Sequence, residues 1–226
     1  EIFLKKKTKF KDKTVLITGS SQGLGGYLAE SFAFNGANVI INYNSNRKLA
    51  EKLHSLLEGV CNSIMIKADV SNKTEVNEMF EKISSHYGSL DILVNNAAIY
   101  EDSTIWKMSE ETWDKVLDVG LKGVYNCTSQ ASKLMKTQKA GKIVNISSVV
   151  GQTKSFGTSN YAAAKAGIIG FSRVIANELA RYNVTVNTVS LGYIEIGMLL
   201  RLPQKIQDMI LQEIPMRRWG YPSEVF

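Results

Sequence analysis

A glycine-rich turn directly after a short apolar run constrains the fold of this chain more than any other feature. Residues 14–17 are apolar or β-branched, and residues 18–25 read TGSSQGLG. Apolar side chains then recur with helical spacing over residues 24–34, and the pattern stops near Asn35 and Gly36. A strand, a tight turn and a helix are predicted in that order. Because glycine has no Cβ, the turn leaves backbone N–H groups and the positive end of the helix open to a pyrophosphate.

The same alternation of short strands and helices continues along the chain. Strands of four to six residues, apolar on both faces and separated by helices, predict a parallel sheet that is covered on both sides. With 226 residues, of which 44% are hydrophobic, the chain can bury one sizeable core. We therefore expect residues 14–226 to form a single doubly wound α/β domain, a Rossmann fold. Further strands are expected at 38–42, 63–67, 90–94, 142–146 and 184–189, and helices at 48–57, from 71, at 110–136 and at 161–181.

The positive charge is concentrated at the N-terminus. Residues 1–13 hold six lysines and two acidic residues, a net charge of +4 out of +6 for the whole chain. We expect these residues to form a basic arm that is a solvated lead-in to the first strand, with a docking role as the alternative. The rest of the chain is nearly neutral, so no nucleic-acid partner is expected.

Cysteine and histidine usage predicts a reduced protein without a metal site. Cys61 and Cys127 lie in unrelated segments without metal-ligand spacing, and His54 and His86 have no partners at ligand spacing. No secretory signal is evident, and the apolar runs are shorter than a membrane span requires. We expect a cytoplasmic protein, or one of an organelle matrix if a targeting segment has been removed, with no membrane role.

A serine, a tyrosine and a lysine form the candidate catalytic group. Tyr161 and Lys165 are four residues apart, so a helix would place them on one face, and Ser148 directly follows a predicted strand. A phenolate and an ammonium about 4 Å apart attract each other by roughly 4 kcal/mol at an effective dielectric constant near 20. The sequence therefore predicts that Lys165 lowers the pKa of Tyr161 far enough for proton transfer near neutral pH.

The end of the second predicted strand favours NADP(H) over NAD(H). Chains that bind NAD usually have an acidic residue there, which hydrogen-bonds to the ribose 2′-hydroxyl. This chain instead has Tyr43, Asn44, Ser45 and then Arg47, with no carboxylate to repel a 2′-phosphate. The alternative for Arg47 is an exposed residue of the next helix.

The glycine turn, residues 95–98 (NNAA), Ser148 and Tyr161-x-x-x-Lys165 occur in the order and approximate spacing of the short-chain dehydrogenase/reductase family. The resemblance extends from about residue 11 to residue 226. Within the family, residues 147–151, 160–167 and 218–222 are most similar to β-ketoacyl-acyl-carrier-protein reductases.

The resemblance implies a role for each candidate residue. Tyr161 would be the general acid that protonates the carbonyl oxygen, Ser148 would hydrogen-bond to that oxygen, and Lys165 would lower the phenol pKa and hold the ribose hydroxyls. Asp69 would lie near the adenine amino group and Asn95 beside the adenosine ribose. The predicted cofactor-binding residues are Gly19, Ser21, Gln22, Gly23, Leu24, Gly25, Tyr43, Asn44, Ser45, Arg47, Asp69, Val70, Asn95, Ala97, Tyr161, Lys165 and Ile194.

The sequence departs from the family pattern at several positions. Gly120 stands where the family commonly has an asparagine that maintains a proton relay to the lysine, which predicts slow turnover. Ala98 replaces a glycine, Leu191 replaces a proline, and Ile196 and Gly197 replace threonine and aspartate. The family's last strand and glycine-rich tail are not found before Phe226.

The resemblance implies NADPH-dependent reduction of a β-ketoacyl thioester on acyl-carrier protein, in fatty acid synthesis. Reduction of a sugar, steroid or other small carbonyl stays open, as does a catalytically weak NADP-binding sensor or scaffold. We expect Lys136, Lys139 and Arg181 to face an acidic carrier protein. Small residues at 162–170 favour close helix packing between subunits, and the family pattern implies a homotetramer.

Overall fold

A computed structural model describes residues 9–197, 199 and 203–226, and its centre is a parallel β-sheet. Six strands are hydrogen-bonded in the order β3-β2-β1-β4-β5-β6 within the described residues. The predicted doubly wound parallel sheet is therefore confirmed. The strands are β1 (Thr14–Ile17), β2 (Asn38–Tyr43), β3 (Ser63–Lys67), β4 (Ile92–Asn95), β5 (Gly141–Ser148) and β6 (Val184–Leu191).

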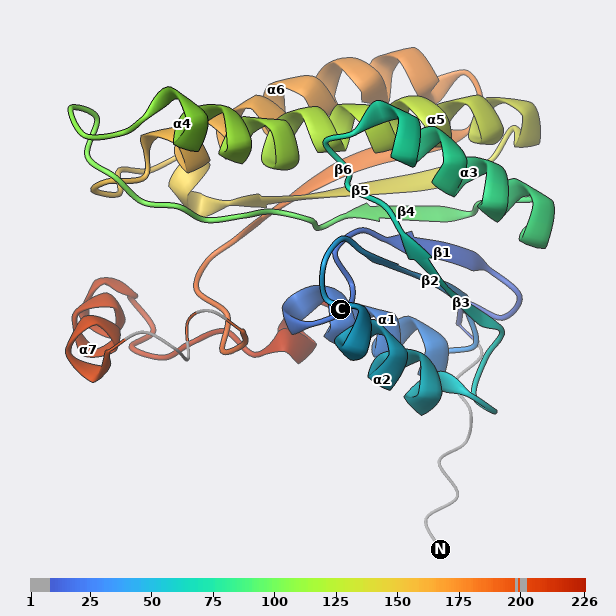
Figure 1. The fold of residues 1–226 in the computed structure, drawn as a ribbon, viewed down its shortest axis with the longest axis horizontal. Helices are drawn as coiled ribbons and strands as arrows, with labels where there is room; N and C mark the ends of the chain where they lie inside the picture. The colour runs from blue at the N-terminus through green and yellow to red at the C-terminus, as the bar shows by residue number, and fades with distance from the viewer. Residues whose placement is uncertain (1–8, 198, 200–202) are drawn as a thin grey trace, which may run out of the picture.

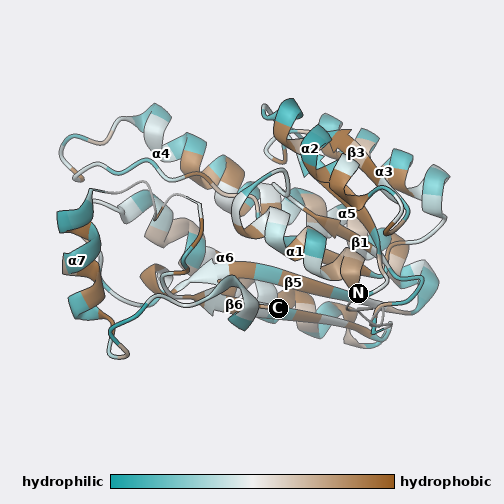
Figure 2. Ribbon diagram, turned by 90° about the horizontal axis from the view of Figure 1, so that it is seen from below, coloured by the Kyte–Doolittle hydropathy of each residue, from teal (hydrophilic) through white to brown (hydrophobic). Residues whose placement is uncertain are grey.

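Helices cover both faces of the sheet (Figure 1). Helices α1 (Gly23–Phe34) and α2 (Arg47–Leu57) lie on one face, and α3 (Lys73–Tyr87), α5 (Gly123–Gln138) and α6 (Ser159–Ala180) lie on the other. Successive strand residues point to opposite faces, so Val15 and Ile17 pack on the α1 side and Leu16 packs on the α3 side. Figure 2 shows the resulting brown, apolar strands beneath helices whose outer turns are teal. None of the helices in the described ranges is long and apolar enough to cross a bilayer.

The strand order creates a topological switch point between β1 and β4. The chain runs from β1 outward through β2 and β3, then returns so that β4 pairs with the other side of β1. The loops that follow β1 and β4 therefore leave the sheet in opposite directions. In open α/β sheets, ligands bind at such a switch point, outside the carboxyl ends of the strands.

The helix predicted at residues 110–136 is divided in the structure. It consists of α4 (Glu110–Leu117), a π-helical turn η1 (Asp118–Lys122) and α5. The apolar periodicity continues through all three elements, which is why the sequence indicates one helix. π-Helical turns within α-helices are rare and occur frequently at functional sites.

Part of the predicted basic arm packs against α1. The Phe10 ring contacts the rings of Phe32 and Phe226, with centroids 4.9 and 5.9 Å away. The Phe10 N–H donates to the Asn35 carbonyl, and Lys13 forms an ion pair with Asp91. Lys9, Lys11, Asp12 and Lys13 are exposed, as a solvated lead-in requires, while Phe10 anchors the segment against α1. Residues 1–8 of the predicted arm lie outside the described residues.

Candidate active site

The glycine turn adopts a conformation that side chains would obstruct. Gly19 and Gly23 have positive φ angles of 63° and 59°. A Cβ on Gly25 would lie 2.6 Å from the Gly19 carbonyl oxygen and 2.9 Å from the Ser20 Cα. Helix α1 begins at Gly23, and its N-cap residue, Gln22, shows no side-chain capping hydrogen bond among the described residues. The turn is thus a backbone cradle at a helix N-terminus, which fits a pyrophosphate.

Buried polar side chains at the ends of β1, β2 and β4 hold this turn. Thr18 Oγ1 accepts hydrogen bonds from the Asn96 and Ala97 N–H groups, at 2.9 and 3.0 Å. The Asn96 Nδ2 donates to the Thr18 carbonyl oxygen, and the Gly19 N–H donates to Asn42 Oδ1. Asn42 was not among the predicted site residues. Its sequence signal is a polar residue inside an otherwise apolar strand, and its role is to position the turn.

The segment after β6 passes beside the same turn. A Cβ on Gly197 would lie 3.8 Å from the Gly23 Cα. Ile194 forms an isolated bridge with Gly220, and the Glu195 N–H donates to the Gly220 carbonyl at 2.8 Å. The predicted contact residue Ile194 is therefore in a segment that borders the turn.

The residues predicted to contact the adenosine end come from β2 and β3. Tyr43 is buried, whereas Asn44, Ser45 and Arg47 are exposed. The Asn44 Nδ2 donates to Asp69 Oδ2 at 3.0 Å, and the other Asp69 oxygen accepts from the Ser71 N–H and hydroxyl. These contacts place Asp69 close to the end of β2.

Two predicted cofactor residues pack in the interior. Asn95 is buried, and its Nδ2 donates to Thr128 Oγ1 at 3.0 Å and to Asn145 Oδ1 at 2.8 Å. The Asn95 side chain therefore joins β4 to β5 and α5, and its predicted place beside the adenosine ribose stays a prediction. Val70 is also buried, and a Cβ on Gly123 would lie 2.7 Å from its Cγ2.

The three predicted catalytic residues lie together at the end of β5 and the start of α6. Ser148 is the last residue of β5, and Tyr161 lies in the first turn of α6. The Ser148 side chain lies close enough to the Tyr161 hydroxyl to lower its pKa. Lys165 is only 2% exposed, and its Nζ lies 5.4 Å from the centroid of the Tyr161 ring. That Nζ donates a hydrogen bond to the Ile146 carbonyl of β5 at 2.8 Å.

The electrostatics differ from the sequence-based prediction for Tyr161. Burial raises the pKa of Tyr161, and the nearby Ser148 side chain lowers it by less. Burial also lowers the pKa of Lys165 to about 8. Desolvation therefore dominates the pKa of Tyr161, and the Lys165 ammonium donates to a backbone carbonyl, so the lowering of the phenol pKa by Lys165 stays a prediction.

Gly120 allows the π-helical turn to pack closely against α6. Gly120 is buried in η1, and a Cβ on it would lie 3.3 Å from the Cβ of Ala164, the neighbour of Lys165. This contact is tighter than most Cβ contacts, so a side chain here would require small shifts. The position where the family commonly has asparagine is thus next to the candidate catalytic lysine.

A cavity of about 480 Å³ adjoins the end of β5. Its lining includes residues of the 3-10 turn Val149–Gly151, which directly follows Ser148 in the sequence. The segments around Tyr193 and Met216 also line it. A larger hollow of about 680 Å³, between α1 and Phe226, has none of the predicted site residues in its lining. The lining of the smaller cavity includes the predicted contact residue Ile194.

The sequence and the fold are both similar to those of known enzymes. A profile described as short chain dehydrogenase matches residues 13–207. The 3-oxoacyl-acyl-carrier-protein reductase FabG of Staphylococcus epidermidis ATCC 35984 is 39% identical over 95% of this chain and 88% of its own length. The enzyme of the same name from Thermotoga maritima is 41% identical over 96% of this chain and 88% of its own length.

A solved structure from Sinorhizobium meliloti 1021, described as a short-chain alcohol dehydrogenase, superposes with a TM-score of 0.89. It is 28% identical and covers 95% of this chain and 86% of its own. The family implies a nicotinamide cofactor, and the glycine cradle fits the pyrophosphate of such a group. This chain belongs to the short-chain dehydrogenase family, and it is an oxidoreductase that acts on a carbonyl and hydroxyl pair.

Proposed function

We propose that this protein reduces a β-ketoacyl thioester, carried on acyl-carrier protein, to the β-hydroxyacyl form in fatty acid synthesis, with NADPH as the reductant. The observation that carries the proposal is the group of Ser148, Tyr161 and Lys165 beside the glycine cradle. The identity of about 40% to reductases of this name supports the substrate class.

The three residues have complementary roles in the proposed reaction. Reduced nicotinamide, when bound, supplies a hydride to a carbonyl carbon. The Ser148 and Tyr161 hydroxyls donate to the carbonyl oxygen, where negative charge develops in the transition state. Because burial raises the pKa of Tyr161, the phenol is protonated at neutral pH and can give up its proton as general acid. Lys165, with a pKa of about 8, is mostly cationic at pH 7 and stabilises the phenolate that remains.

The end of β2 supports a preference for NADP(H). Arg47 is exposed and forms an ion pair with Glu51 at 2.7 Å. Exposed ion pairs contribute only about 0–1 kcal/mol, so a 2′-phosphate can replace Glu51 as the partner at small cost. The nearby Asp69 carboxylate, which follows β3, accepts hydrogen bonds from Asn44 and Ser71.

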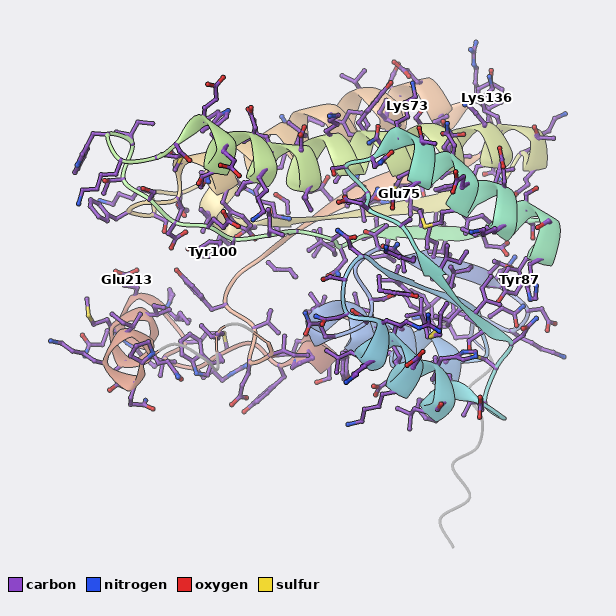
Figure 3. All side chains as sticks on the ribbon, viewed as in Figure 1. Lys73, Glu75, Tyr87, Tyr100, Lys136 and Glu213 are labelled. Carbon is purple, nitrogen blue, oxygen red and sulfur yellow. The ribbon has the colours of Figure 1, made fainter. Side chains whose placement is uncertain are left out.

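The residues predicted to face the carrier protein are distant from Tyr161 within one subunit. Arg181 caps the C-terminal end of α6, and a rise of about 1.5 Å per residue places it about 30 Å from Tyr161. The Lys136 Nζ and the Arg181 Cζ each lie 5.0 Å from the centroid of the Tyr182 ring. Figure 3 shows Lys136 at the opposite end of the α/β body from Tyr100, a neighbour of Tyr161. A carrier protein bound at one active site would therefore contact the Lys136 and Arg181 of another subunit in an oligomer.

Two other functions have a specific observation in their favour. The Sinorhizobium relative favours a small alcohol or carbonyl substrate, and Gly120 favours a weak NADP-binding sensor. NADPH oxidation with acetoacetyl thioesters, simple ketones, sugars and steroids separates the three. We expect kcat/KM for the thioester to exceed that for simple ketones by about 100-fold, since binding of the remote pantetheine portion lowers the barrier. Equal rates would indicate a general carbonyl reductase, and tight NADPH binding without turnover would indicate a sensor.

A further inference from the structure

A second tyrosine packs against Tyr161. The Tyr100 ring meets the Tyr161 ring edge to face, with centroids 5.0 Å apart and planes at 78°. The Asp102 carboxylate lies near the Tyr100 hydroxyl. Tyr100 belongs to no motif, so nothing in the sequence singled it out. Figure 3 shows it at the end of the sheet where α4 begins and α7 (Gln204–Glu213) lies.

The segment that carries Tyr100 is fastened to the first turn of α6. The Ser103 N–H donates to the Gly157 carbonyl at 2.9 Å, and Ser103 forms a bridge with Thr158. The fully buried Asn160 donates from Nδ2 to the Glu101 carbonyl, and its Oδ1 accepts from the Tyr161 N–H at 2.8 Å. Asn160 thus connects the backbone beside Tyr100 to the backbone of Tyr161, so the two rings are held by a shared framework.

The Tyr161 ring consequently has defined neighbours. The Tyr100 ring centroid lies 5.0 Å from that of Tyr161, and the Lys165 ammonium lies 5.4 Å from the Tyr161 ring centroid. The hydrogen bonds of Asn160 hold the segment that carries Tyr100 beside this ring. Burial raises the pKa of Tyr100 strongly, so its phenol stays protonated at neutral pH. The arrangement orients Tyr161 and adds no second acid.

We propose that Tyr100 is a positioning residue whose ring fixes the orientation of the Tyr161 hydroxyl. The inference rests on the proposed role of Tyr161 as general acid. A positioning role differs from a packing role in what it predicts. If Tyr100 only packed against Tyr161, its removal would lower folding stability, but it would not lower kcat while the Kd for NADPH stayed unchanged.

The test compares Tyr100→Ala, which removes the ring, with Tyr100→Phe, which retains it. We expect Tyr100→Ala to lower kcat at least about tenfold with an unchanged Kd for NADPH, because misplaced reacting groups cost rate more than binding. Tyr100→Phe should keep kcat within about threefold, since the edge-to-face contact remains. Phe34→Ala is the matched control, because Phe34 is a 49% exposed aromatic residue at the end of α1, and its turnover should equal that of the wild type. Wild-type kcat in Tyr100→Ala would overturn the inference.

Crystal structures of the two variants give a readout that does not depend on turnover. Tyr161 should keep one rotamer in Tyr100→Phe and adopt another or several in Tyr100→Ala. One unchanged rotamer in both variants would contradict the inference. If the wild type reduces no substrate of the panel, the proposed function fails, and these structures still decide the positioning role.

Discussion

At the scale of single residues, the buried ammonium of Lys165 is the costliest feature of the site. Its Nζ donates to one backbone carbonyl, and burial lowers its pKa from 10.5 to about 8. That difference corresponds to about 3 kcal/mol of lost folding stability at pH 7. The buried Lys165 ammonium lowers folding stability, but it lies where it can stabilise the Tyr161 phenolate that forms in the reaction.

Lys165→Met should therefore stabilise the fold at neutral pH while it abolishes turnover. The folded-state pKa is lower than the unfolded one, so the unfolded chain binds more protons between pH 8 and 10.5. The cost of the lysine is complete below about pH 8 and is relieved as the pH rises toward 10.5. Thermal unfolding should show a higher Tm for Lys165→Met at pH 7 and a smaller gain at pH 10. A gain that is independent of pH would contradict the assigned cost.

Arg47 provides a second prediction at this scale. Arg47→Ala should reduce the ratio of kcat/KM for NADPH to that for NADH about tenfold, because a charged hydrogen bond to the 2′-phosphate is lost. Glu51→Ala is the control, since it removes the ion-pair partner of Arg47 and leaves the arginine in place. The control should keep or increase the preference for NADPH. An unchanged ratio in Arg47→Ala would exclude Arg47 as the discriminating residue.

At the scale of elements, the sequence predicted β1, the glycine turn and α1 well, because their pattern is local. It did not predict the π-helical turn η1, since apolar periodicity continues from α4 into α5. It grouped Ser148, Tyr161 and Lys165 correctly, but it missed the effect of burial on their pKa values. Tyr100 and the buried amide of Asn95 depend on contacts between distant segments, which no local pattern indicates.

The π-helical turn carries a prediction of its own. Gly120→Asn should raise kcat if the missing amide limits proton supply to Lys165. Gly120→Ala adds the same Cβ, 3.3 Å from the Ala164 Cβ, without an amide, and it should leave kcat unchanged. Steady-state kinetics of both variants, with Tm as a check on folding, measures the difference. The relay argument fails if asparagine and alanine have the same effect.

At the scale of the whole molecule, an exposed stripe on α6 favours association of subunits. Ala166, Gly170 and Val174 recur every four residues on one face of the helix and are all exposed. A Cβ on Gly170 would meet nothing within 4 Å in this subunit. Small side chains allow helix backbones to approach closely, so this face suits a second copy of α6. The expected homotetramer would use it.

Val174→Glu should weaken that association. Val174 is 58% exposed in the single subunit, and a carboxylate there would be buried without a partner in the interface. Sedimentation analysis should give about four times the 25.1 kDa subunit mass for the wild type and a smaller mass for the variant. Leu56→Glu, at an exposed position on α2, should retain the wild-type mass. A wild-type protein with the mass of one subunit would contradict the oligomer.

The most direct test of the whole account is NADPH oxidation with an acetoacetyl thioester by the wild type and by Tyr161→Phe. Loss of a general acid that also stabilises charge should lower kcat by at least about 10³-fold. The Kd for NADPH should stay the same, because the ring and its contacts with Tyr100 and Lys165 remain. The account predicts an inactive variant that binds NADPH normally, and a variant that reduces the thioester at the wild-type rate would contradict it.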